Sequence, residues 1–456
     1  MNHCPTLLHP VRPHWLALFA ALACGLANAA EPARAETLIP YEKFSLDNGL
    51  TVIVHTDRKA PIVAVNLWYH VGSKNERPGR TGFAHLFEHL MFQGSEHFDD
   101  EFFKPFEAVG ATNQNGTTSF DRTNYFQNVP TTALDMALWM ESDRMGHLLG
   151  VVTQERLDEQ RGVVQNEKRQ GENRPFGRVW ESVFRASFPP GHPYRWLPIG
   201  SMEDLNAATL DDVHEWFRTY YGAANVVLVL AGDIDAATAR EKAQKYFGHI
   251  APGPGLDRPG TWVAARTEST REIMHDQVAQ TRLYRFWNTA PDGSLDAELL
   301  SIVGQILGGG KTSRLYERLV YREQMADTVS AGLSGFEIAG LFGITADVKA
   351  GVPHARVEAA IAEELQRFIA KGPTDAELAR ARTAIRAGFV KGLERIGGFG
   401  GKADVLAACE VFEGDPGCYR RSLQVLESAT PEQLREAAQR WLAQGDYTLE
   451  VHPVPR

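Results

Sequence analysis

The chain has 456 residues, 43% of them hydrophobic and 23% charged, and a formal net charge of −10. This length exceeds what a single hydrophobic core usually serves, so we expect two or more domains. The acidic balance, without a sustained run of Lys and Arg, argues against nucleic acid as the main partner. Beyond the N-terminal segment no apolar run is long enough for a membrane span, so we expect no transmembrane anchor.

The first residues have the pattern of a secretory signal peptide. Arg12 precedes an apolar run at 15–26, and Ala27-Asn28-Ala29 offers the small residues that signal peptidase requires. We therefore expect residues 1–29 to be removed on export to the periplasm. Cys24 raises the alternative of a lipoprotein anchor, but the residues before it match the usual Leu-led motif poorly.

Removal of the signal peptide leaves two of the four cysteines, Cys409 and Cys418, in an oxidising compartment. The segment between them contains Gly414, Pro416 and Gly417, which favour a tight turn. We expect Cys409 and Cys418 to form a disulfide.

Strand-like and helix-like patterns alternate along the first half of the chain. Strands are expected at 50–55, 62–69, 124–129 and 225–230, and helices at 81–92, 133–149, 153–170 and 236–247. A Pro/Gly cluster at 251–255 then ends this half.

A similar order of patterns returns in the second half. Strands are expected at 281–288, 327–335, 341–348 and 447–451, with a helix at 295–307 and further helices before the last strand. We therefore predict an α+β protein with two homologous domains, at 40–250 and 271–456, joined by a linker at 251–270.

A candidate metal-binding motif lies within the predicted helix at 81–92. In His85-Leu86-Phe87-Glu88-His89 the two histidines are four residues apart, so they project one above the other on one helix face. Two imidazoles in this arrangement suit one zinc ion, and the order is that of the inverted zincin motif. Glu88 lies beside them, where it can act as general base on a zinc-bound water that attacks a peptide carbonyl.

A catalytic zinc needs one more protein ligand. The predicted helix at 153–170 and the residues after it offer four candidates, and spacing alone does not choose among them: Glu155, Glu159, Glu167 and Glu172. The alternative to a metal site is a pair of ordinary histidines beside a glutamate. Such a pair needs no acidic ligand downstream.

Together these residues resemble the pitrilysin/insulinase family of zinc peptidases in its short two-domain form, and the resemblance covers the mature chain. In that family the third zinc ligand ends an apolar-apolar-x-x-Glu segment, which Val163-Val164-Gln165-Asn166-Glu167 matches. The resemblance therefore implies one zinc ion held by His85, His89 and Glu167. It also implies two α/β-sandwich domains, each a mostly antiparallel sheet covered by helices. Family members often have a supporting glutamate two helical turns before the ligand, where this chain has Gln160, which adds no charge.

The segment 111–118 resembles the substrate-side edge strand of the same family. Asn115 matches a backbone-binding asparagine, and Gly116 stands where many relatives have alanine without disturbing the match. The resemblance implies that Asn115, Gly116 and Thr117 bind a peptide as an added strand, which demands little of the substrate's side chains. The alternative is an ordinary edge strand protected by polar residues.

The segment Gly308-Gly309-Gly310-Lys311 is not a phosphate-binding loop, because Gln305 stands where a P-loop needs its first glycine. It resembles the glycine-rich turn of the family. After this turn, catalytic relatives or their partners carry an arginine and a tyrosine that polarise the substrate carbonyl, whereas this chain has Val320 and Asp327. The resemblance therefore implies a dimer with a related chain that provides the Arg/Tyr pair and encloses a chamber.

The expected function is that of a zinc-dependent endopeptidase, which hydrolyses peptides or unfolded segments inside the chamber with Glu88 as general base. One rival is a non-catalytic structural or docking subunit of the same family, which Val320, Asp327 and Gln160 favour. Another is a zinc-dependent amidase or other small-molecule hydrolase.

Overall fold

The structure is a computed structural model that describes residues 38–455. The expected signal peptide, with Cys4 and Cys24, lies outside these residues. From Ile39 onward the chain forms one compact unit. No helix in the described range combines the length and the apolar character that a membrane crossing requires.

The first half of the chain is built on a six-stranded sheet with the order β1-β2-β6-β3-β5-β4. Its strands are β1 (Glu42–Ser45), β2 (Thr51–Thr56), β3 (Ile62–Tyr69), β4 (Thr112–Thr118), β5 (Thr123–Pro130) and β6 (Val226–Gly232). Only β2 and β6 run parallel, and the other neighbours are antiparallel. Strand β4 therefore lies at the edge of this sheet, with β5 as its only strand neighbour in the described chain.

The second half is built on a five-stranded sheet with the order β7-β11-β8-β10-β9. Its strands are β7 (Thr270–Asp276), β8 (Arg282–Thr289), β9 (Ala326–Gly335), β10 (Gly340–Val348) and β11 (Tyr447–Pro453). This order repeats β2-β6-β3-β5-β4, including the single parallel pair, here β7 with β11. The predicted repeat of two α+β units, each with a mostly antiparallel sheet, is confirmed. Residues 251–269 contain no helix or strand, while the domain boundaries themselves stay a prediction.

Helices cover both sheets. Those of the first half are α1 (Phe83–Leu90), α2 (Phe103–Ala108), α3 (Leu134–Gly146), α4 (Gln154–Glu172), α5 (Val179–Ser187), α6 (Met202–Ala207), α7 (Leu210–Tyr220) and α8 (Ala236–Phe247). Those of the second half are α9 (Leu295–Gly308), α10 (His354–Lys371), α11 (Asp375–Gly392), α12 (Lys402–Glu413), α13 (Tyr419–Ser428) and α14 (Pro431–Leu442).

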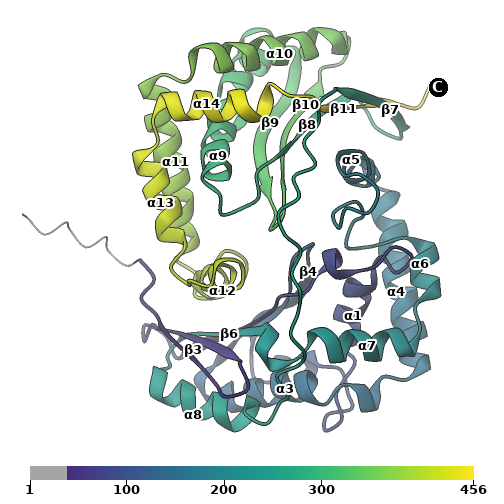
Figure 1. Cartoon of the computed structure of the whole chain (residues 1–456), viewed down its shortest axis with the longest axis vertical. Coiled ribbons are helices and arrows are strands. Elements are labelled where there is room, and N and C mark those ends of the chain that lie inside the picture. The colour runs from purple at the N-terminus through teal and green to yellow at the C-terminus, as the bar shows by residue number, and fades with distance from the viewer. Residues whose placement is uncertain (1–37, 456) are drawn as a thin grey trace, which may run out of the picture. The chain divides into compact units, whose positions relative to one another are not determined.

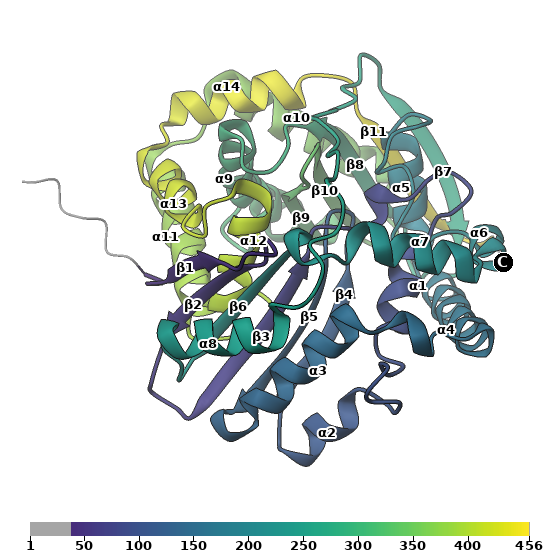
Figure 2. The same ribbon diagram turned by 60° about the horizontal axis from the view of Figure 1, so that its bottom comes forward.

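One helix of each half packs on the sheet of the other half. Helix α12 packs on β2, β3 and β6 (Figures 1 and 2). The ring of Phe412 meets Trp68 edge-on there, with ring centroids 5.9 Å apart. Helix α5 packs on β8 and β11, and Phe184 and Phe188 share one buried cluster with Leu449. Because each sheet buries a face under a helix from the other half, the two halves stabilise each other.

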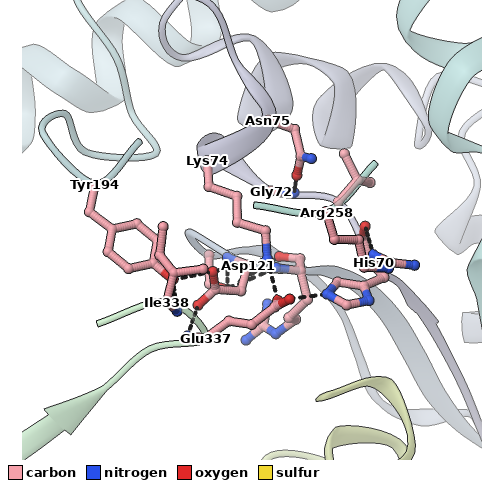
Figure 3. A network of polar contacts seen from close by, with 12 residues as sticks. His70, Gly72, Lys74, Asn75, Asp121, Tyr194, Arg258, Glu337 and Ile338 are labelled. Carbon is pink, nitrogen blue, oxygen red and sulfur yellow. Dashed lines mark hydrogen bonds and ion pairs between the residues drawn. The ribbon is translucent and has the colours of Figure 1, made fainter. Parts of the chain in front are cut away.

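A buried ionic network also joins the halves (Figure 3). The Lys74 ammonium, whose side chain is 1% exposed, pairs with Asp121 at 3.2 Å and with Glu337 from the turn between β9 and β10. Glu337 also lies 2.6 Å from His70, and Tyr194 donates to Asp121 at 2.6 Å. Each charge in this network has a partner of opposite sign, as burial requires.

The network makes the stability of the protein depend on pH. Burial alone would raise the pKa of Glu337, but the hydrogen bond with His70 and the charge of Lys74 lower it to about 2. Burial lowers the pKa of His70. Both shifts mean that the unfolded chain binds more protons than the folded one, so stability is lost on acidification. The loss begins below about pH 6.5 for His70 and extends from about pH 4.5 toward pH 2 for Glu337.

We expect Glu337→Gln to lower the free energy of unfolding at pH 7 by about 3 kcal/mol, because Lys74 loses a charged partner. The variant should also lose less stability than the wild type between pH 5 and pH 3. Urea denaturation at pH 7, 5, 4 and 3 measures both effects. Glu317→Gln, which removes a half-exposed partner of Arg322, is the matched control and should change little. Equal pH dependence in wild type and Glu337→Gln would contradict the account.

Candidate metal centre

Helix α1 begins after a glycine in the left-handed conformation, and a buried carboxyl group binds the N–H groups at its start. Gly82, which precedes the helix, has a φ of +85° and provides no side-chain cap. The Glu76 carboxyl instead accepts hydrogen bonds from the backbone N–H groups of Gly82 at 3.1 Å and Ala84 at 2.8 Å, and from the Trp196 indole at 2.8 Å. Burial raises the pKa of Glu76 to about 8, although these donors act in the opposite direction. Glu76 therefore satisfies N–H groups that the helix start leaves without partners.

Three side chains meet between α1 and α4. The Nε2 atoms of His85 and His89 lie 3.3 Å apart, and Glu167 Oε2 lies 3.7 Å from each of them. The two rings are nearly perpendicular, with an interplanar angle of 88°. The three ligand atoms thus converge on a single point.

The structure separates the four glutamates that spacing left open. Only Glu167 joins the two histidines, within the part of the chain that the structure describes. Glu155 and Glu159 are exposed on α4, and Glu172 pairs with Lys168 at 2.7 Å.

The geometry and the electrostatics fit a zinc ion. Tetrahedral coordination with bonds of about 2.0–2.1 Å places ligand atoms about 3.3–3.5 Å apart, close to the observed separations. Burial, together with the His89 ring, lowers the pKa of His85 to about 4, and burial also lowers the pKa of His89. Both imidazoles are therefore neutral at pH 7, so each has a lone pair for a metal.

The surroundings of the two imidazoles differ. Gln160 is buried on α4 and its side chain hydrogen-bonds His89, so the amide orients that ring without adding charge. His85 Nδ1 is buried without a hydrogen-bond partner among the described protein atoms.

Glu88 lies on α1 beside the two histidines and is 7% exposed. The Thr118 hydroxyl, from the end of β4, donates a hydrogen bond of 2.6 Å to Glu88 Oε2. Burial raises the pKa of Glu88 to about 7, although Thr118 and the nearby Arg122 act in the opposite direction. The sequence offered no signal for Thr118 or Glu76. Thr118 contacts Glu88 from another element, and Glu76 reaches the start of α1 from an irregular segment, so no periodic pattern marks either residue.

The three residues expected to bind substrate lie on β4 but differ in exposure. Asn115 is exposed, and its side chain accepts a hydrogen bond of 3.0 Å from the backbone N–H of Gly116. Thr117 is half-buried, and its carbonyl oxygen accepts a hydrogen bond of 3.0 Å from the Arg122 guanidinium. Gly116 is buried, and a Cβ there would lie 2.7 Å from the Phe92 ring and 3.1 Å from Glu88. Alanine at this position would therefore press against the Phe92 ring and Glu88.

Val320 and Asp327, which stand where an arginine and a tyrosine were expected, contact other residues of the second half. Val320 lies in the π-helical segment Tyr316–Arg322 and packs against the second hydrophobic core. Asp327, on β9, accepts a hydrogen bond of 3.1 Å from Gln280. The structure joins Cys409, in the last turns of α12, to Cys418, just before α13, in a disulfide with Cα atoms 5.3 Å apart.

Two family models match the chain. The model for insulinase (peptidase family M16) matches residues 51–188, and the model for the peptidase M16 inactive domain matches residues 207–385. The HxxEH motif, Glu167 and β4 all lie in the first of these ranges.

Named relatives and solved structures agree with these matches. The zinc protease PqqE of Helicobacter pylori is 29% identical over 383 residues, which cover 81% of this chain and 84% of that protein. An uncharacterized zinc protease of Streptomyces coelicolor is 25% identical over 90% of this chain and 91% of its own.

Among solved structures, a protease from Helicobacter pylori superimposes with a TM-score of 0.82 at 25% identity, covering 91% of this chain and all of that one. The first half of the periplasmic protease PqqL from Escherichia coli has the same fold, with a TM-score of 0.73 at 18% identity, over 91% of this chain and 92% of that one. The chain therefore belongs to the M16 (insulinase) family of peptidases.

Proposed function

We propose that the protein is a zinc-dependent endopeptidase that hydrolyses peptides or unfolded segments. One observation carries the proposal: His85, His89 and Glu167 converge within 3.7 Å of one another, with the buried Glu88 carboxyl beside them. Two imidazoles and one carboxylate form the ligand set of a catalytic zinc with an open position. The relatives are named zinc proteases, which supports a zinc-dependent peptidase activity for this chain.

Glu88 acts as the general base in this proposal. A zinc ion at the site would polarise the substrate carbonyl and lower the pKa of water. Glu88 accepts the proton of the attacking water and returns it to the leaving amine, for which a pKa near 7 is suitable. Thr118 holds one oxygen of Glu88, so the other oxygen remains available for the proton.

The free edge of β4 binds the substrate. An extended peptide adds to this edge as a further strand, with its main chain paired to that of Asn115, Gly116 and Thr117. Thr118, which holds Glu88, follows directly in the same strand, so the edge delivers a peptide bond to the base. Main-chain pairing favours flexible segments over folded proteins.

A second candidate function is that of a docking subunit. It rests on Val320, which packs into a hydrophobic core, and on Asp327, which is bound by Gln280, at positions where arginine and tyrosine were expected. These residues provide no donor for a developing oxyanion. We therefore propose that a related chain provides the Arg/Tyr pair in a dimer that encloses a chamber. An oxyanion donor is worth about 3–4 kcal/mol.

Export to the periplasm is part of the proposal. It rests on the pattern of residues 1–29 and on the likeness in fold to a protease described as periplasmic.

The roles of the acidic residues can be separated by two substitutions. Glu88→Gln should bind zinc as the wild type does and lose at least about 10³-fold in kcat/KM, because the base is removed and the ligands remain. Glu167→Gln should bind zinc at least about 100-fold more weakly. Zinc content by mass spectrometry and cleavage of a quenched peptide library, with any required partner present, measure these effects.

Glu159→Gln is the matched control, because Glu159 is exposed on the same helix and belongs to no ligand group among the described residues. A Glu88→Gln protein with wild-type activity, or a Glu167→Gln protein with wild-type zinc affinity, would refute the assigned roles.

Gly116→Ala tests the close contact between β4 and the base. The added Cβ would force the Phe92 ring and Glu88 to shift, so we expect a loss of about 1–2 kcal/mol in stability and a larger effect on kcat than on KM. Gly162→Ala is the matched control, since a Cβ at Gly162 of α4 meets no atom of residues 38–455 within 4 Å. Unchanged kcat and melting temperature in Gly116→Ala would show that the contact does not constrain Glu88.

Dependence on a partner can be measured directly. Peptidase activity of the chain alone should rise about 10²-fold or more when a related chain with the arginine and the tyrosine is added, because that chain provides the oxyanion donors. Activity of the isolated chain at the level of the mixture would contradict this dependence. Stoichiometric zinc without cleavage in either sample would favour the docking subunit.

A further inference from the structure

A second group of possible metal ligands lies in the second half of the chain, apart from α1 and β4. Glu450 and His452 are two residues apart on β11, so their side chains project from one face of the strand. His354 is the first residue of α10. The Nε2 atoms of His452 and His354 lie 2.8 and 3.2 Å from the same carboxylate oxygen, Glu450 Oε2. Figure 1 shows that α10 runs beside the sheet that contains β11.

We infer that His354, Glu450 and His452 form a second binding site for a divalent transition metal ion of the zinc class. The three ligand atoms all lie within 4.8 Å of one another, which small side-chain movements reduce to the separations that zinc requires. Two imidazoles and a carboxylate favour Zn²⁺, Ni²⁺ or Cu²⁺ over Ca²⁺ and Mg²⁺, which prefer oxygen ligands.

The carboxylate of this site is held in one orientation by its other oxygen. The Arg271 guanidinium, from β7, bonds Glu450 Oε1, which leaves Oε2 to face the two imidazoles. Arg271 also pairs with Glu358, one helical turn after His354 on α10. Two carboxylates and one guanidinium leave a net charge of −1 beside the two imidazoles, so a bound cation is attracted to the cluster.

The imidazole of His452 is also held from its far side. Thr281 Oγ1 lies 3.1 Å from His452 Nδ1, and this contact directs Nε2 toward Glu450. Metal-bound histidines usually have an oxygen partner of this kind on the second ring nitrogen. By contrast, no such partner is found for His85 Nδ1 among the described protein atoms of the first site.

Exposure of the three side chains increases from the base of the site to its rim. The side chain of Glu450 is 4% exposed, that of His452 is 21% exposed and that of His354 is 41% exposed. The buried carboxylate anchors the site, and the exposed rim admits an ion together with the water molecules that complete its coordination. An ion bound here joins the first turn of α10 to β11, which lies inside the second sheet, and therefore stabilises the second half.

The experiment uses the full chain with His85→Ala and His89→Ala, which removes the proposed catalytic site. After treatment with a chelator, this protein is titrated with Zn²⁺ alone by isothermal calorimetry. We expect binding of an ion that is lost when His452→Ala is added and weakened at least tenfold by Glu450→Gln. Zinc at about 100-fold excess over its dissociation constant should also raise the melting temperature by about 2–5 °C, and only when His452 is present.

His214→Ala, which removes a histidine outside this cluster, is the matched control and should leave the titration unchanged. Far-UV circular dichroism of each apo variant shows whether the fold is kept, and Glu450→Gln tests the site if His452→Ala misfolds. Zinc binding that is equal with and without His452, or the absence of binding in the background protein, would overturn the inference. Either result leaves the proposed peptidase activity untouched, because the first site is removed throughout.

Discussion

The structure depends on a packing constraint, because each sheet must cover an apolar face with a helix that its own half does not provide. Helix α12 of the second half covers β2, β3 and β6, and α5 of the first half covers β8 and β11. The ionic network around Lys74 and Glu337 lies where the two halves meet and is fully paired (Figure 3). Separation of the two halves would expose apolar surface and leave charges unpaired, so the candidate site rests on a rigid base.

The rigid base fixes three elements that bring the chemistry together. Helix α1 provides His85, Glu88 and His89, α4 provides Glu167, and the edge strand β4 provides Thr118. Burial keeps the imidazoles neutral and raises the pKa of Glu88 to about 7. The same burial that stabilises the first half therefore suits the proposed metal ligands and the proposed base to neutral pH.

Local patterns in the sequence predicted the parts of the fold that depend on local periodicity. The helix expected at 153–170 is α4, and the HxxEH motif lies on one face of α1. Periodicity missed β7, whose residues are mostly exposed at a sheet edge and lack a clear alternation of apolar and polar types. It also missed α5, a nine-residue helix whose buried side chains pack against both halves of the chain. Glu76 and Thr118 could not be recognised because their hydrogen bonds follow no helical or strand repeat in the sequence. The choice of Glu167 came from family resemblance, and geometry then gave it a physical reason.

The central claim is that one metal ion binds between α1 and α4. Anomalous diffraction from crystals of the full chain, recorded on both sides of the zinc absorption edge, tests it most directly. The account predicts a zinc peak within bonding distance of His85, His89 and Glu167, with Glu88 adjacent but not coordinated. A fully ordered site without a peak in zinc-saturated crystals, or a peak bound by another carboxylate of α4 in place of Glu167, would contradict it.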